Sequence, residues 1–376
     1  MIFMSNHVKK TYLRKISVMC LIVLAFTLCS FSAVFAGPYG GGSTPPPPTL
    51  PPATPVTENV KTDHDKAIDQ ALRQTGEAVL SLGNNNTAQI SPTVVNALAR
   101  ANESLTLERP GVNVQFSQQA LQAPAITNAV RAENAVVELG VQVVSQAEAN
   151  NILASAPLGQ STGLFSVGGI MVDLSAQVRT GTTTTRIDSF PEPVAVTLDL
   201  SALGTLTQEE INQLTGVRLE KDASGKTVAV SLGGTYDPVK KTFTFYTDRF
   251  SYYTVMKNTK LVKISLTLNN STAIVNGTSK ILDSPATLVN DRTMVPLRFV
   301  AESMGVKVDW IDAARTVKMK QDGKELVLVI DKPLPGMDVP AKIIKNRTMV
   351  PLRYVSESFG ANVKWFPSSY RVEVVK

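Results

Sequence analysis

Cysteine and histidine each occur only twice in this sequence of 376 residues. Both cysteines, Cys20 and Cys29, lie in an apolar stretch near the N-terminus, so the rest of the chain has no thiol for a disulfide or a thiolate metal site. His7 lies in the same region, which leaves His64 alone for any Ser-His-Asp triad or imidazole site. We therefore expect no cofactor, no metal site and no catalytic centre built on a thiol or on imidazoles.

The first 36 residues have the pattern of a secretory signal peptide. Basic residues between positions 9 and 15 precede a nearly uncharged apolar run, which ends at Ala36 with small residues at the positions that a signal peptidase recognises. We expect export, cleavage after Ala36 and an extracellular or cell-surface location. An uncleaved membrane anchor is the alternative, because the run is about long enough to span a bilayer. After cleavage we expect no membrane span.

Residues 37–57, GPYGGGSTPPPPTLPPATPVT, have no charge and no apolar periodicity. Proline runs favour the polyproline II conformation, so this stretch predicts a semi-rigid spacer behind a short glycine hinge. The charge of the chain is distributed unevenly, because residues 258–376 carry 18 basic against 11 acidic side chains. This basic part would suit an anionic partner such as a wall polymer or a membrane surface, but we favour the simpler interpretation of a solvated lysine-rich face. Scattered lysines without interleaved aromatic residues argue against nucleic acid.

Residues 58–257 predict a module with helices at its start and strands after them. Residues 58–82 have a helical pattern in which Ile68 and Leu72 share a face. A second helix is predicted to begin at Pro92 after the N-cap Ser91. Short segments with period-two alternation then follow, separated by turns, which is typical of an antiparallel sandwich. These segments are LTLE, VNVQFS, AVVELGVQVV, GIMVDLSAQV, VAVTLDLS, TVAVSL, KTFTFYT and YYTVMK.

The part from Ile90 to Lys257 resembles a β-rich module of bacterial surface-layer and wall proteins. The resemblance rests on the stretches GLFSVGGIMVDLSA, PVAVTLDLS and GTYDPVKKTFTFYTDRFSYYTVMK. The last stretch ends in an aromatic-rich strand, as that module does. The resemblance implies a binding or structural role at a cell surface.

The heptapeptide RTMVPLR occurs twice, at 292–298 and at 347–353. The copies extend from Asp283 to Trp310 and from Asp338 to Trp365, in one register 55 residues apart. About two-thirds of the positions between the first arginine and the tryptophan are identical. A duplication of this extent indicates one supersecondary unit built twice. We expect the repeats to span about 263–320 and 321–376, and to share one sheet and one core because a lone unit would be marginally stable.

Each copy predicts a strand–helix–strand–strand unit. The short strands TLV and KII precede a turn, and Pro296 and Pro351 suit the first position of a helix. Gly305 and Gly360 are predicted to end these helices, after which VKVDW and NVKW return as strands paired with TVKMK and RVEVV. The predicted fold is therefore a multi-domain chain, mainly β, in which a sandwich-like module with N-terminal helices precedes a duplicated α+β domain.

The stretches VNG, LDSPA, DRTMVPLRFVAESMGVKVDW and NRTMVPLRYVSESFGANVKW resemble the copper amine oxidase N-terminal-like domain, also called the stalk domain. The resemblance covers about Lys263 to Lys376, and it implies two repeats that form a small antiparallel sheet around helices. VNG has no counterpart before the second copy, where DKPLPG stands, so we expect an altered hairpin there. Amine oxidase activity requires three imidazoles on copper and a tyrosine-derived quinone in a separate catalytic domain, and this chain has too few histidines for it.

The charged and aromatic residues of the repeats are the candidate contact residues. Arg298 with Glu302, and Arg353 with Glu357, are spaced to pair along a helix. Arg292 and Arg347 precede the helices and could bond turn carbonyls or a nearby carboxylate, or hold an anionic group of a wall polymer or peptide. We favour the structural role. The chain's only tryptophans, Trp310 and Trp365, close the two units.

The sequence thus predicts an exported, non-enzymatic bacterial protein of the cell surface or wall. Its expected partner is peptidoglycan, an anionic wall polymer or another surface protein. The alternative is an extracellular hydrolase that acts on wall glycans through two carboxylates of the central module. The acidic pairs that could serve, Asp63 with Asp65 and Glu209 with Glu210, have the pattern of exposed helix starts instead.

Overall fold

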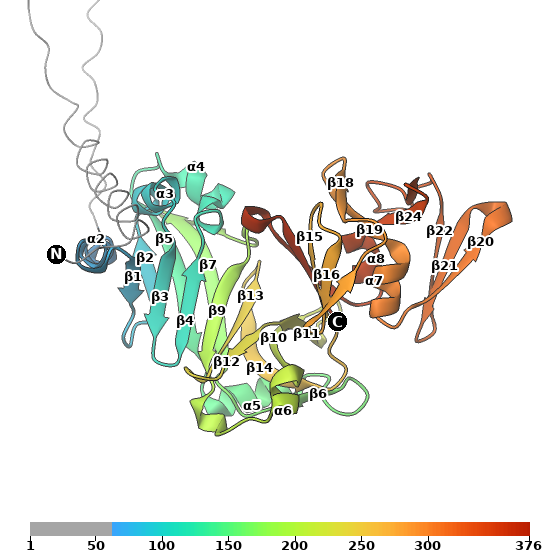
Figure 1. Ribbon diagram of the computed structural model, residues 1–376. Coiled ribbons are helices and arrows are strands. Elements are labelled where there is room, and N and C mark those ends of the chain that lie inside the picture. Colours follow the sequence, from blue (N-terminus) through green and yellow to red (C-terminus); the bar gives the residue numbers. More distant parts are fainter. Residues whose placement is uncertain (1–61) are drawn as a thin grey trace, which may run out of the picture.

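The structure is a computed structural model that describes residues 62–376. The predicted signal peptide, the proline-rich spacer and residues 58–61 lie outside the described residues. Figure 1 shows two bodies side by side, the first coloured from blue to yellow and the second from orange to red. Each has its own large apolar core, formed by residues between Ile68 and Val255 in the first and between Ile264 and Val374 in the second. The prediction of a β-rich chain with several sheets is confirmed.

The first body, called the β module here, is a sandwich of two sheets. One sheet has the order β1 (Ala78–Ser81), β3 (Leu105–Arg109), β4 (Val112–Phe116), β9 (Val194–Asp199), β13 (Thr242–Thr247) and β12 (Thr235–Asp237). The other has the order β11 (Thr227–Gly233), β10 (Leu214–Lys221), β14 (Tyr252–Asn258), β7 (Val172–Thr180), β5 (Ala135–Val143) and β2 (Thr87–Ile90), with β6 (Leu164–Ser166) beside β14 and β8 (Thr183–Arg186) beside β7. Neighbouring strands are antiparallel except β1 and β3.

Aromatic side chains fill the space between the two sheets. The rings of Phe245 on β13 and Tyr253 on β14 stack with centroids 5.7 Å apart. Gly216 on β10 allows this close approach, because a Cβ atom there would lie 2.3 Å from the Phe245 ring. Segments with period-two alternation became strands as predicted, since alternate residues such as those of β4 and β13 are buried.

Short helices cover the ends and one outer face of the β module. They are α2 (Asp63–Thr75), α3 (Pro92–Arg100), α4 (Pro124–Ala129), α5 (Gln146–Ala154) and α6 (Gln208–Gln213). The helix at Pro92 is confirmed, with Val95, Leu98 and Ala99 buried. The helix predicted over residues 58–82 is wrong beyond Thr75. Gly76 takes a left-handed conformation (φ 72°) that ends α2, and the following residues pair as β1 with β3.

The second body, called the repeat domain here, contains three small sheets around two helices. The first sheet has the order β17 (Thr278–Ile281), β16 (Thr272–Val275), β15 (Lys263–Thr267), β26 (Arg371–Val375) and β25 (Asn362–Phe366). The second has the order β18 (Thr287–Val289), β19 (Arg292–Pro296), β24 (Arg347–Pro351) and β23 (Lys342–Ile344). The third is β20 (Lys307–Ile311), β21 (Thr316–Gln321) and β22 (Lys324–Val329), and the helices are α7 (Leu297–Ser303) and α8 (Leu352–Ser358).

The two copies fold alike and share one core. Strands of both copies pair in the four-stranded sheet, where β19 lies beside β24, and in the five-stranded sheet, where β15 lies beside β26. The predicted sharing of a sheet is therefore confirmed, in two sheets rather than one, although the C-terminal hairpins β20–β21 and β25–β26 belong to different sheets. As expected, the first copy's hairpin β16–β17 is altered in the second copy, where β22 is followed by turns and coil up to β23.

The helix boundaries follow from local chemistry. Pro296 and Pro351 are the N-caps of α7 and α8 and the last residues of the preceding strands, one position earlier than predicted. Gly305 and Gly360 end the helices as predicted, with φ of 76° and 79°. After α7, the Val306 amide donates to the Ala301 carbonyl at 2.9 Å and the Gly305 amide to the Glu302 carbonyl at 3.0 Å, which are the two bonds of a Schellman ending.

Because Leu297 and Leu352 are both buried in one core, Leu297→Ala should destabilise both copies together. We expect a loss of about 2–5 kcal/mol in the free energy of unfolding. Tryptophan fluorescence in Trp310→Phe and Trp365→Phe backgrounds reports each copy separately. Both reporters should show the same lowered urea midpoint. The substitution of the neighbouring exposed residue, Arg298→Ala, should change the free energy of unfolding by no more than about 1 kcal/mol with either reporter. A Trp365 transition left unmoved by Leu297→Ala would mean that the copies do not share a core.

Candidate functional site

The first arginines of the two heptapeptides form reciprocal ion pairs across the duplication. Nε of Arg292 lies 2.8 Å from Oδ2 of Asp338, and Nε of Arg347 lies 2.9 Å from Oδ2 of Asp283. Each arginine of one copy therefore pairs with the aspartate that begins the other copy. A second guanidinium nitrogen donates to the carbonyl of the preceding residue, Asp291 at 3.3 Å and Asn346 at 3.1 Å. Both arginines thus make the turn-carbonyl and carboxylate contacts that the structural role requires.

Tight turns place these arginines. Asn290-Asp291 and Lys345-Asn346 connect the paired strands of each hairpin, and all four residues have positive φ, between 47° and 59°. This is the geometry of a type I′ turn, which matches the twist of a two-stranded hairpin and favours asparagine and aspartate. The arginine that follows each turn is at the start of β19 or β24, where its side chain reaches the loop of the other copy.

The paired strands β19 and β24 connect the two copies through the backbone. Val295 lies opposite Val350, and both side chains are fully buried in the shared core. On the other face of the sheet, Met294, Met349 and Val339 form a small separate cluster. The repeated segment therefore forms the contact between the copies, with apolar residues on both faces of its sheet.

The second arginines pair along the helices, as their spacing predicts. Arg298 lies 3.7 Å from Glu302, and Arg353 lies 4.0 Å from Glu357. Glu357 is half-buried, and burial raises the pKa of its carboxyl, an effect that Arg353 and Arg249 of the β module oppose. The second copy therefore lies against charged groups of the β module.

The two tryptophans differ in their surroundings. Trp310 on β20 is 39 % exposed, and its indole nitrogen donates to Asp312 at 3.2 Å. Trp365 on β25 packs partly against the shared core, and its ring meets Tyr370 edge-on with centroids 6.3 Å apart. Both close their units as structural residues.

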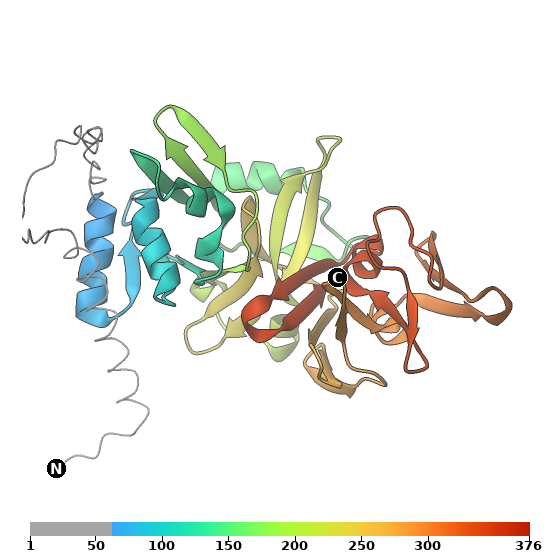
Figure 2. The ribbon, with the colours of Figure 1, turned by 90° about the horizontal axis from the view of Figure 1, so that it is seen from above.

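Lys364 on β25 is buried where the repeat domain meets the β module. Its side chain is 2 % exposed, and its ammonium donates to the Leu232 carbonyl of β11 at 2.8 Å. Burial lowers the pKa of this ammonium to about 7, an effect that Glu373 and Asp248 oppose and that Arg218 and Arg371 increase. Figure 2 shows the red hairpin β25–β26 extending along the β module.

A buried carboxylate makes a second connection at the same junction. Glu192 of the β module is 4 % exposed and accepts hydrogen bonds from Ser117 of its own module and from Ser368 of the repeat domain, both at 2.5 Å. The Ser368 amide adds a longer bond of 3.3 Å. Buried carboxylates are costly unless their oxygens are satisfied, so both partners of Glu192 stabilise the docked arrangement.

Aromatic contacts complete the junction. Phe366 meets Tyr246 of β13 edge-on with centroids 5.2 Å apart, and the Arg371 guanidinium lies 4.0 Å from the centre of the Phe366 ring. The Phe366 ring thus makes a favourable edge-to-face contact with Tyr246 and a favourable cation–π contact with Arg371. The junction therefore combines two buried charges with a desolvated aromatic contact.

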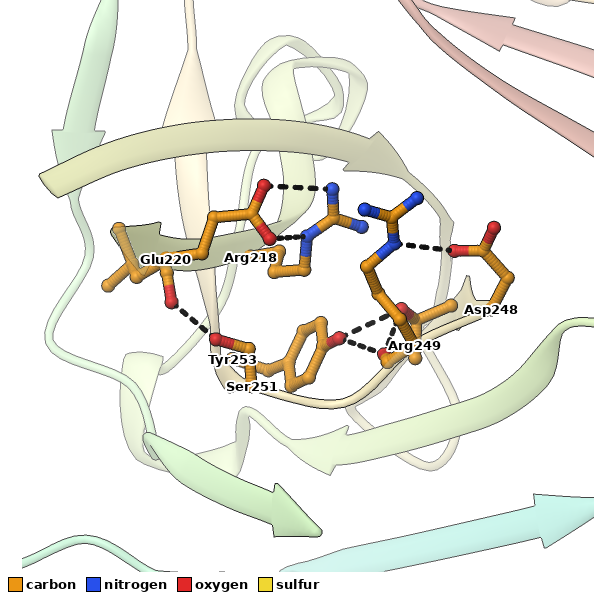
Figure 3. A network of polar contacts seen from close by, with 8 residues as sticks. Arg218, Glu220, Asp248, Arg249, Ser251 and Tyr253 are labelled. Carbon is orange, nitrogen blue, oxygen red and sulfur yellow. Dashed lines mark hydrogen bonds and ion pairs between the residues drawn. The ribbon is translucent and has the colours of Figure 1, made fainter. Parts of the chain in front are cut away.

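A polar network involves β10, β14 and the loop that connects β13 to β14 (Figure 3). Arg218 of β10, 4 % exposed, forms a bidentate pair with Glu220 at 2.8 and 3.3 Å, and its Nη1 has no hydrogen-bond partner in the described structure. Asp248 and Arg249 pair nearby at 3.7 Å. The Tyr253 hydroxyl contacts Thr247 and donates to the Arg249 carbonyl, and burial raises the pKa of this phenol. Arg218 and Asp248 of this network act on the pKa of the Lys364 ammonium in opposite directions.

Comparison of the two copies could have revealed the junction residues, which the sequence interpretation missed. Lys364, Phe366 and Ser368 correspond to Asp309, Ile311 and Ala313 in the first copy, around the tryptophan that both copies have. In the first copy these positions are exposed. The copies thus differ where only one of them contacts the β module.

The acidic pairs considered for hydrolysis serve as helix caps. Glu210 caps α6 through Thr207, and Asp65 caps α2 through Thr62. The prediction that Asp65 is exposed is wrong, because it is fully buried and also accepts from the Ser91 amide at 3.0 Å. The imidazole of His64 accepts from the Gln89 amide at 2.9 Å. In residues 62–376 no group of three or more possible metal ligands occurs, and no helix there is both long and apolar enough to cross a membrane.

Comparison with known families agrees with this geometry. Residues 209–374 match the copper amine oxidase N-terminal domain. The match falls in two overlapping segments, 209–319 and 312–374, which correspond to the duplication. It begins before the predicted boundary at residue 263 and includes α6 and strands β10 to β14 of the β module. A search of curated proteins found no match.

The matched region is the N-terminal domain of those oxidases and not their catalytic domain. The copper chemistry does not fit this chain. A three-imidazole copper site needs more histidines than the one in the described part, and that residue, His64, already accepts a backbone hydrogen bond.

The reciprocal pairing can be tested by double-mutant cycles. Arg292→Ala with Asp338→Ala, and Arg347→Ala with Asp283→Ala, should each give a coupling energy of about 0.2–1 kcal/mol in urea unfolding, the range for exposed ion pairs. Arg292→Ala combined with Asp283→Ala is the matched control within one copy and should be additive. Coupling in the control, with none across the copies, would contradict the reciprocal arrangement.

The buried Lys364 predicts a pH-dependent stability. Between about pH 7 and its ordinary value of 10.5, the unfolded chain binds a proton at this lysine that the folded chain does not, so stability rises with pH. Below about pH 7 both states are protonated and this contribution no longer changes. Lys364→Met should therefore stabilise the protein more at pH 7 than at pH 10, relative to wild type. Urea unfolding followed by Trp365 fluorescence measures the free energy of unfolding at each pH, with the exposed Lys332→Met as control. If the difference in this free energy between Lys364→Met and wild type did not depend on pH, the buried ammonium would be contradicted.

Proposed function

We propose that this chain is an exported, non-enzymatic protein of a bacterial cell surface or wall, in which the repeat domain serves as a structural spacer or wall-associating stalk. The single observation that carries the proposal is the use of the repeated heptapeptide. Its arginines form ion pairs between the copies and its valines form their shared core. A motif used to join two copies of a unit supports a structural role over a reaction centre.

The junction supports the same role for the β module. Buried contacts from Lys364, Glu192 and Phe366 hold the module against the second copy. Two bodies joined in this way present their free surfaces at a fixed mutual orientation, as a spacer requires. The β module, which resembles modules of surface-layer and wall proteins, would then face a partner such as another surface protein.

Cell fractionation with and without wall digestion tests the location, and binding of the purified chain to isolated walls tests the association. We expect the chain in the wall fraction and release on digestion. A turbidity assay on purified walls separates this role from hydrolysis, because a structural protein should leave turbidity unchanged. Wall clearing by the pure protein would overturn the non-enzymatic proposal.

The double substitution Arg292→Lys and Arg347→Lys asks whether these arginines also hold an anion. Lysine keeps the charge but loses the second donor that contacts the turn carbonyl. With a purely structural role, we expect thermal stability to fall slightly and wall binding of the folded variant to persist. The matched control is Arg298→Lys with Arg353→Lys. Loss of wall binding at unchanged stability, confined to the first pair, would show an anion site instead.

A further inference from the structure

A small open groove of about 200 Å³ lies where β11 and β12 of the β module meet the five-stranded sheet. Both bodies contribute to its walls, and boundaries between folded units are common places for binding sites. Its volume lies below the roughly 300–1,000 Å³ of pockets that enclose a whole small molecule. A groove of this size suits the end of a longer chain. The residues that matter for its chemistry are Gly234, Tyr246, Lys263, Ser265, Ile274 and Glu373.

Lys263 is the cation in the lining of this groove, and it is weakly paired. Its ammonium makes one long contact, 3.4 Å to the Gly234 carbonyl. Glu373, the acid in the lining, is paired with Arg371 on the same strand. Burial lowers the pKa of the Lys263 ammonium, an effect that the nearby Glu373 opposes. With only one long hydrogen bond, the ammonium has donors left for a carboxylate beside it.

The rest of the groove offers groups that suit an extended peptide. β12 is an edge strand, so the outer edge of its backbone is not paired within the sheet. Ile274 is 48 % exposed on β16, and Ile281 on β17 is 83 % exposed on the same face of that hairpin. The hydroxyls of Tyr246 and Ser265 have no hydrogen-bond partner in the described structure. Extended peptides bind such edges through backbone hydrogen bonds, with apolar side chains in neighbouring depressions.

A sugar is the less suitable occupant. Saccharide recognition commonly uses an exposed aromatic face, and the aromatic residue here, Tyr246, is engaged edge-on with Phe366. We propose that the groove binds the C-terminal end of an extended protein chain, with the terminal carboxylate against Lys263. The proposal does not depend on wall association, because isolated peptides test it in solution.

The test uses N-acetyl-Ala-Ala-Thr-Ala as the free acid, the same peptide as its C-terminal amide, and an N-acetylglucosamine tetramer. Each is titrated into the ¹⁵N-labelled full chain and followed by amide chemical shifts. The acid should shift the amides of Gly233, Gly234, Thr235 and Ser265 and bind at least tenfold more tightly than the amide. Equal binding of acid and amide, or no shifts in the groove with either, would overturn the proposal. Binding of the sugar there in place of the peptide would do so too.

Variants separate recognition from folding. Lys263→Gln should remove the preference for the acid, whereas Lys280→Gln, on the opposite face of the same sheet, should keep it. Ile274→Glu adds a carboxylate at a half-exposed position, so it should weaken binding of the acid at least tenfold with an unchanged thermal midpoint. Retained preference in Lys263→Gln, or unaltered affinity in Ile274→Glu, would contradict the assignment.

Discussion

The pairing of β19 with β24 is the contact on which the repeat domain depends. A single copy has one short helix and two hairpins, too little to bury its own apolar surface. By placing Val295 opposite Val350, the pair brings α7 and α8 to the same side of one sheet and closes a shared core. The reciprocal arginine–aspartate pairs at the rim are exposed and individually weak. They fix how the copies are aligned, whereas burial supplies most of the stability.

This arrangement explains why the heptapeptide is so similar in both copies. Several of its residues contact the other copy or position a residue that does so: the first arginine reaches across, the valine is buried, and the proline ends the strand and caps the helix. A change in one copy therefore alters a contact that both copies use. The C-terminal hairpins lie in separate sheets and are free of this constraint. The surroundings of the two copies differ most at these hairpins.

Much of this fold could be predicted from the sequence, because its signals are local. Alternating strands, the Pro92 helix, the glycines that end α7 and α8 and the i,i+4 pairs all depend on neighbours within a turn or a strand.

The errors came from long-range contacts. Residues 78–81 were assigned to a helix because their pairing with β3 is not visible locally, and Asp65 was assigned to the surface because its contact with Ser91 is not visible either. The partners of Arg292 and Arg347 were left open among turn carbonyls, a nearby carboxylate and an external anion for the same reason, because the aspartates of the other copy are distant in sequence. Lys364 and Glu192 were missed entirely, because a lone lysine or glutamate in a sequence indicates an exposed side chain.

The buried charges at the junction are better explained by selectivity than by stability, since replacing such groups with apolar ones is often neutral or favourable. Two copies with nearly the same backbone could in principle dock on the β module. With the first copy in that place, Asp309 would put a carboxylate against the Leu232 carbonyl, where Lys364 now donates. Ala313 would leave an oxygen of the buried Glu192 without the Ser368 hydroxyl. Each mismatch buries an unpaired polar group, which costs more than a correct pair contributes. The junction thus discriminates between the copies through what the wrong one would leave unsatisfied.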